Sequence, residues 1–194
     1  MPYDYTDAPP PQFELVPHGT VATVVLHIRA GNVGEDGMLK RSKDGGCEML
    51  DCEFVIADGP YKGRKFWEYW ILEGTTSGHA KSADINRGTL KAILDSALGL
   101  KPDDVSPQTR SARTVSLKQF EGMTFIAKIG IEKGGTKNDG SGDWPDKNIL
   151  AGVITPDRKE WHQVEQPPPF NGGGAPPAGT APSSAPPVPR PGWA

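Results

Sequence analysis

Alternation of apolar and polar residues in short segments constrains the fold of this chain more than any other feature. In residues 21–29, Ala22, Val24, Leu26 and Ile28 are apolar at every second position, which is the period of a strand with one buried face. Similar segments predict further strands over 48–56, 62–73, 123–133 and 149–155. The chain therefore reads as a sheet protein with few helices.

One helix interrupts this series. The stripe i, i+3, i+4, i+7, i+8 predicts an amphipathic helix, which Gly99 would cap and Pro102 would follow. Its members are Leu90, Ile93, Leu94, Ala97 and Leu98. Ser106-Pro107 is a candidate start for a second, short helix, since proline is accepted in a first turn.

The resulting order is strand, strand, strand, helix, strand, strand, which is the order of the OB-fold. We therefore predict a mainly β fold, a five-stranded OB-like Greek-key barrel with one helix between strands 3 and 4. The long connections 31–46 and 134–147 fall where that fold places its binding loops. A different small mixed domain with five strands and a helix remains an alternative.

Proline, glycine and charge divide the 194 residues into three parts. Residues 1–18 form an acidic, Pro-rich N-terminal arm, 19–166 the OB-like domain, and 167–194 a tail with ten prolines, five glycines and Arg190 as its one charge. Such a tail buries too little apolar area to offset its ordering entropy, so we expect the Pro-rich ends to be disordered.

Charge and cysteine content exclude several classes of protein. The net charge is −3, and the arm carries −3 and the tail +1, which leaves −1 for the domain. A heavily basic nucleic-acid coat is therefore excluded. No apolar run is long enough for a membrane span, no secretory leader is evident at the start, and two cysteines are too few for a disulfide scaffold. We expect a protein of a reducing compartment such as the cytoplasm, without membrane contact.

Basic residues lie in the three places where an OB-fold binds single strands, and aromatic residues lie beside them in two of these places. Such binding needs cations for phosphates and flat rings on which bases stack. The predicted contacts lie in the first long loop, in the third strand and in the second long loop. They are Lys40, Arg41, Lys43, Lys65, Trp67, Tyr69, Lys133, Lys137 and Trp144.

The sequence leaves two features of this site partly open, namely which side chains of strand 62–73 face outward and where Trp144 lies. We take Phe66, Trp70 and Leu72 as inward, which turns Lys65, Trp67, Tyr69 and Ile71 outward. Trp144 is either an anchor against the domain or a mobile stacking platform. Because the domain is nearly neutral, nucleic-acid binding further requires that its positive charge be gathered on one face.

The sequence favours no enzyme. It lacks the phosphate-binding, dinucleotide-binding and zincin motifs, and we predict no catalytic residue, metal or cofactor. Asp51 and Glu53 share one strand face and could hold Mg²⁺, although acids beside Lys-rich strands more often make cross-strand pairs. Cys52 is expected to be a small buried apolar residue.

Several segments resemble a family of phage-encoded proteins, found in phages and prophages and long without a known function. They are DGGCEMLDCEF at 44–54, GPY at 59–61, RKFW at 64–67, EGT at 73–75, KSADINRG at 81–88 and FIAKIG at 125–130. Members look like OB-fold single-stranded DNA-binding proteins and lie among replication and recombination genes. The resemblance, over about 13–165, implies that this chain holds single-stranded DNA during phage replication or recombination.

The tail departs from bacterial single-strand-binding proteins, which typically end in an acidic tip that recruits partners. This chain has no acid in its last 28 residues and ends RPGWA. The tail is therefore a spacer or a different docking motif for phage or host proteins. An alternative function is a non-catalytic adaptor whose Pro-rich arms bind proteins, without DNA affinity. The sequence does not specify the oligomeric state, and a homo-oligomer is one option.

Overall fold

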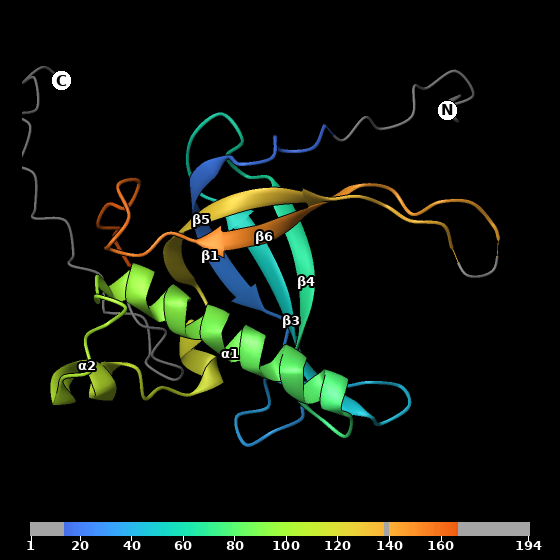
Figure 1. Cartoon of the computed structure of the whole chain (residues 1–194), viewed down its shortest axis with the longest axis horizontal. Coiled ribbons are helices and arrows are strands. Elements are labelled where there is room, and N and C mark those ends of the chain that lie inside the picture. The colour runs from blue at the N-terminus through green and yellow to red at the C-terminus, as the bar shows by residue number, and fades with distance from the viewer. Residues whose placement is uncertain (1–13, 138–139, 167–194) are drawn as a thin grey trace, which may run out of the picture.

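The computed structural model describes residues 14–137 and 140–166, and its centre is an open antiparallel sheet (Figure 1). The strands are β1 (Val21–Ile28), β2 (Lys40–Arg41), β3 (Cys47–Ile56), β4 (Lys65–Gly74), β5 (Met123–Glu132) and β6 (Lys147–Val153). Their order is β2-β3-β1-β5-β6, and β4 also pairs with β3. The expected mainly β fold with one main helix is confirmed. The expected arm over 1–13 and tail over 167–194 lie outside the described residues.

Each predicted strand is present, with shifted ends. β4 begins at Lys65 rather than 62, because 58–63 forms turns in which Gly59 and Gly63 have φ of 69° and 84°, values that favour glycine. The expected loop 31–46 contains the two-residue strand β2, which pairs with Glu48 and Met49 of β3. This loop is also anchored by Met38 and Leu39, both of which are buried.

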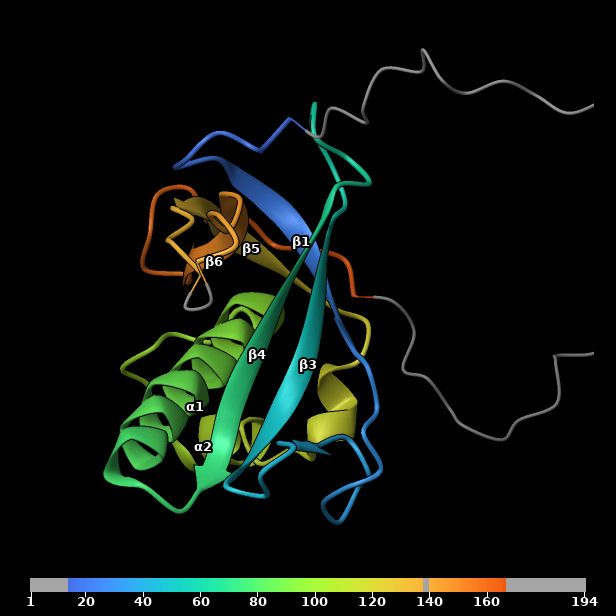
Figure 2. The same ribbon diagram turned by 90° about the vertical axis from the view of Figure 1, so that its right-hand side faces the viewer.

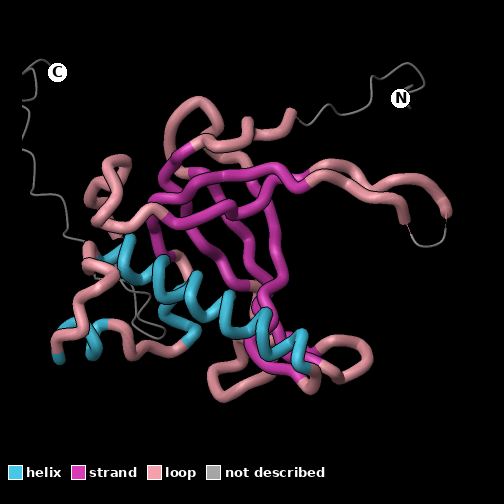
Figure 3. The backbone as a smooth tube through the Cα atoms, viewed as in Figure 1, coloured by secondary structure: helices cyan, strands magenta, loops and turns pink. Residues whose placement is uncertain are grey.

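Helix α1 (Ser77–Leu98) lies beside the sheet, with its long axis across the ends of the strands (Figure 3). The predicted stripe is its C-terminal half, and Gly99 caps it with φ of 69°, as expected. Thr76 caps the other end by accepting a hydrogen bond from the His79 N–H. α2 (Pro107–Ala112) follows the Ser106 cap, and η1 (Leu117–Phe120) precedes β5. Within the described residues, no helix is both long and apolar enough to cross a membrane.

The core lies between the inward sheet face and α1, with Phe54 at its centre. The Phe54 ring centroid lies 4.9 Å from that of Phe66, 5.4 Å from Trp70 and 6.4 Å from Phe125. These rings come from β3, β4 and β5, so one aromatic cluster joins three strands. Leu90, Ile93, Leu94 and Ala97 of α1 close the core from the helix side. Cys52 is fully buried in it, as expected, and burial raises the pKa of its thiol.

The folded body begins before residue 19. Val16, assigned by the sequence to the N-terminal arm, is 2% exposed and belongs to the core. Its backbone N–H donates to Asn148 Oδ1, and its carbonyl accepts from Asn148 Nδ2. The segment from 14 therefore packs against β6 as part of the domain.

The two end strands of the sheet, β4 and β6, are linked by the side chain of Glu68. Glu68 of β4 accepts hydrogen bonds from the Leu150 backbone N–H of β6 and from Trp70 Nε1. Asn86 and Arg87 of α1 donate to the carbonyls of Ile71 and Leu72 of β4. These side chains satisfy backbone groups that an edge strand would otherwise present to another chain.

Candidate nucleic-acid interface

The sheet face opposite the core, here called the outer face, brings β4, β3 and β1 together (Figure 2). The predicted facing of β4 is confirmed, since Phe66, Trp70 and Leu72 are buried while Trp67 is 46% and Tyr69 63% exposed. Lys65 and Ile71 share the outer parity, and Lys65 is exposed. Two aromatic side chains and a cation are thus presented along one strand.

The register across the strands arranges the outer face in rows. His27 of β1 is paired with Glu53 of β3, which is paired with Trp67 of β4. In the next row, Asp51 is paired with Tyr69, and the Asp51 carbonyl accepts the Arg29 backbone N–H. A carboxylate therefore lies beside each exposed ring of β4.

Glu53 is the centre of a cluster of three donors. Its Oε1 accepts from Lys65 Nζ at 2.6 Å, and its Oε2 accepts from Trp67 Nε1 at 2.9 Å and from Arg29 Nη2 at 3.0 Å. Arg29 also lies over the Trp67 ring, with its guanidinium carbon 5.7 Å from the ring centroid. The Lys65 ammonium, then the Trp67 N–H and the Arg29 guanidinium, lower the pKa of Glu53 to about 2. The carboxylate is therefore ionised at neutral pH.

The first predicted basic group, Lys40, Arg41 and Lys43, is held differently from a free loop. Lys40 forms an ion pair with Asp51, which is buried on the outer side of β3. Arg41 Nη2 lies 2.6 Å from Glu48 Oε1 across the β2–β3 pair. Within the described residues, no carboxylate forms an ion pair with Lys43, which is exposed.

The β5–β6 connection projects away from the sheet (Figure 1). Trp144 is 62% exposed there, so it does not anchor the connection against the domain. Lys137 Nζ lies 5.0 Å from the Trp144 ring centroid. The backbone of Gly134 packs closely against the backbone of Trp144, since a Cβ on Gly134 would lie 1.6 Å from the Trp144 carbonyl oxygen. Lys133, the other predicted cation here, forms an ion pair with Asp146 at 2.6 Å.

The expectation of positive charge gathered on one face is wrong for this interface. Four of the six predicted phosphate-binding cations form ion pairs, each with its own carboxylate: Lys40–Asp51, Arg41–Glu48, Lys65–Glu53 and Lys133–Asp146. For Lys40 and Lys65 the reason is the alternation of β3, which puts Asp51 and Glu53 on the same side as these two cations. Asp51 and Glu53 thus make pairs with cations, the role expected of them rather than Mg²⁺ binding.

Sequence reasoning expected Glu53 to pair with a cation, but it missed Arg29 as a partner of that carboxylate and the hydrogen bond from Trp67 to Glu53. Arg29 carried a signal, because its parity on the first strand places it on the non-core face with His27. The contact of Glu53 with Trp67 depends on the β3–β4 register, which the spacing of the two strands does not specify.

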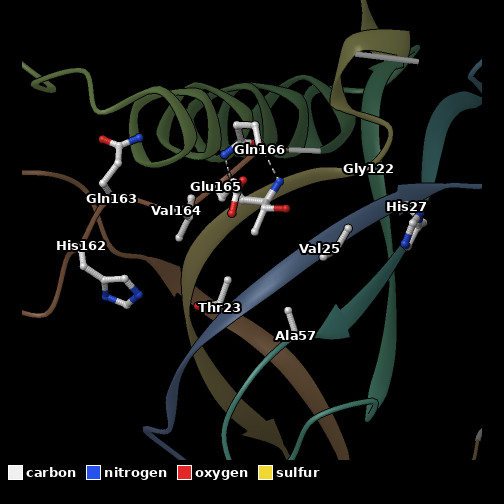
Figure 4. Close-up of a pocket in the computed structure, with 11 residues that line it drawn as sticks. Thr23, Val25, His27, Ala57, Gly122, His162, Gln163, Val164, Glu165 and Gln166 are labelled. Carbon is white, nitrogen blue, oxygen red and sulfur yellow. Dashed lines mark hydrogen bonds between the residues drawn. The ribbon is translucent and has the colours of Figure 1, made fainter. Parts of the chain in front are cut away.

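A concave surface lies on the outer face as well, where β1 runs beside β5 (Figure 4). It is a hollow of about 760 Å³, lined by Val25 and His27 of β1 and by the segment 162–166. Gln166 fixes that segment, since its side-chain amide donates to the Thr124 carbonyl and accepts from the Thr124 N–H. Glu165 lines the hollow and Glu121 pairs with His27 at 2.8 Å. These carboxylates disfavour a polyanion here, so the outer face of β3 and β4 is the better candidate.

No protein-family model, curated protein or solved structure matches this chain.

Proposed function

We propose that this chain binds single-stranded DNA on the outer face of β3 and β4, and that bases stack on Trp67 and Tyr69. The observation that carries the proposal is the exposure of these two rings at alternate positions of one strand, with Lys65 and Arg29 beside them. A mixed aromatic and basic surface is the usual platform for single strands.

The spacing of the two rings favours a single strand over a duplex. Residues two apart in a strand are separated by about 6.8 Å, whereas successive bases within a duplex rise by about 3.4 Å. Neighbouring bases can each stack on one ring only when the nucleic acid is extended. We therefore expect little sequence preference and a strong preference for single strands.

The sheet order supports the finer proposal that the domain is an OB-like barrel. Read along the sheet, β4, β3, β1, β5 and β6 follow the OB order, and α1 lies in the expected connection between β4 and β5. The Glu68–Leu150 hydrogen bond lies between the two end strands, where such a barrel would close. The resemblance to phage-encoded proteins supports a role in phage or prophage replication or recombination in a bacterial cytoplasm.

Fluorescence anisotropy of a labelled poly-dT oligonucleotide at 50 and 200 mM salt tests the proposal. Because most of the basic groups are ion-paired, we expect a shallow slope, about −0.7 for each phosphate neutralised and one or two phosphates in all. A duplex of the same length should bind at least tenfold more weakly. A folded sample that does not bind the single strand at 50 mM salt would refute the proposal.

The ion pairing of the predicted cations favours one second candidate, an adaptor that binds proteins through its Pro-rich ends. Deletion of 167–194 separates the two functions. A DNA-binding domain keeps its affinity for poly-dT after this deletion, whereas an adaptor loses its protein partner and shows no affinity for poly-dT before or after it.

A further inference from the structure

Glu53 occupies the position that a phosphate would need in order to use both cations of the outer face. Lys65 Nζ and Arg29 Nη2 lie within 2.6 Å and 3.0 Å of its two carboxylate oxygens. The Glu53 side chain is only 15% exposed, whereas those of Lys65 and Arg29 are 49% and 50% exposed. The negative charge therefore lies beneath two cations that themselves face solvent.

The same carboxylate fixes the orientation of a stacking ring. Trp67 donates its indole N–H to Glu53 Oε2 at 2.9 Å, although the ring is 46% exposed. A ring held in one orientation before binding loses less conformational entropy when a base stacks on it. One oxygen of Glu53 thus links the ring to Arg29, which also lies over the ring.

Resting on the proposed function, we propose that Glu53 is both a positioning residue and a built-in counter-anion of this site. It holds Trp67 in the orientation for stacking, and it withholds Lys65 and Arg29 from phosphates. Strand binding is then governed by stacking and depends weakly on salt, because few counterions are released from the nucleic acid.

Two substitutions separate the roles. Glu53→Gln removes the charge but keeps an amide oxygen that can accept from the Trp67 indole, whereas Glu53→Ala removes both. Glu53→Gln frees two cations, so the slope of log K against log salt steepens by up to about 1.4, and the variant loses up to about sevenfold more affinity than wild type between 50 and 200 mM. Glu53→Ala shows the same steep slope, with affinity about two- to twelvefold below that of Glu53→Gln at each salt concentration, the cost of ordering one side chain on binding.

Asp84→Asn is the matched control, since it removes one carboxylate from the Arg87 ion pair on α1. It should leave the salt slope at the wild-type value. The Trp67 indole N–H signal in a ¹H–¹⁵N correlation spectrum reports on the Trp67–Glu53 hydrogen bond without nucleic acid. We expect Glu53→Ala to shift this signal most, Glu53→Gln less, and Asp84→Asn not at all.

The salt slope tests the counter-anion role of Glu53, and the affinity tests its positioning role. Equal slopes in wild type and Glu53→Gln contradict the counter-anion role, and equal affinities of Glu53→Ala and Glu53→Gln contradict the positioning role. If wild type binds poly-dT, either result overturns the Glu53 proposal and leaves the proposed function intact. If no variant binds at 50 mM salt, the proposed function fails and the role of Glu53 fails with it.

Discussion

Glu68 of β4 accepts the backbone N–H of Leu150 of β6, although these strands lie at opposite ends of the sheet order. The side chain shares the inward parity of Phe66 and Trp70 and also accepts from Trp70 Nε1 at 2.9 Å. A carboxylate at an inward position of a strand is costly unless it is hydrogen-bonded. Here both oxygens are used, so one residue supports the two end strands and a core tryptophan.

Glu68→Ala should destabilise the domain. The Leu150 N–H and the Trp70 indole N–H would each lose an acceptor, and a buried donor left unpaired costs roughly 1–3 kcal/mol. Glu68→Gln keeps one acceptor oxygen and should lose about half as much stability.

Urea unfolding measures the difference in free energy of unfolding, and Glu73→Ala on the same strand is the control. Glu73 is exposed and faces Glu48 across β3 and β4, so its removal should be neutral or slightly stabilising. Equal losses for Glu68→Ala and Glu73→Ala would contradict this role.

The buried carboxylate of Asp95 predicts unequal effects for its two cationic partners. Arg113 Nε lies 2.7 Å from Asp95 Oδ1, and the Arg113 side chain is only 13% exposed. Lys91 Nζ lies 2.8 Å from Oδ2, but its side chain is 45% exposed. Breaking a buried pair costs about 3–5 kcal/mol, whereas an exposed pair contributes about 0–1 kcal/mol. Arg113→Met should therefore lower the free energy of unfolding far more than Lys91→Met, and similar urea midpoints would show that Asp95 does not depend on Arg113.

The sequence predicted the strands well because one face of each is buried. Alternation located β1, β3 and β5 within two residues at either end, and the shared parity of Phe66, Trp70 and Leu72 indicated the exposure of Trp67 and Tyr69. The first half of α1 gave no such signal. Between 77 and 89 only Ala83 is buried, so apolar periodicity appears only from Leu90 onward.

The electrostatic character of the site could not be predicted in the same way. The ion pairs of Lys65 and Arg29 with Glu53 bridge separations of 12 and 24 residues, and they exist because β3 lies between β1 and β4 in one particular register. A shift of one residue would turn Glu53 toward the core. Composition reports how many charges a chain carries, but only the register decides which of them neutralise one another.

Removal of either exposed ring of β4 should weaken binding to poly-dT without changing its salt dependence. Stacking contributes about 1–3 kcal/mol per base, so Trp67→Ala or Tyr69→Ala should lose roughly five- to 150-fold in affinity. Ile85→Ala removes an exposed apolar side chain from α1 and should bind as wild type does. Anisotropy titrations at two salt concentrations measure both quantities. If Trp67→Ala and Ile85→Ala bind equally well, the bases do not stack on β4.

Acid should remove the contribution of Glu53 to stability within a defined pH range. The pKa of Glu53 is about 2 in the folded chain, because Lys65, Trp67 and Arg29 donate to its ionised form, against an ordinary value of 4.5. Between these values the unfolded state binds more protons than the folded state, so the stabilisation is complete above about pH 4.5 and declines as pH falls toward 2.

The Glu53→Gln variant lacks this titrating carboxyl group. The difference in free energy of unfolding between wild type and Glu53→Gln, measured by urea denaturation at pH 7, 4 and 3, should therefore be largest at pH 7 and smallest at pH 3. A difference that stays constant down to pH 3 would mean that the three donors do not stabilise the carboxylate.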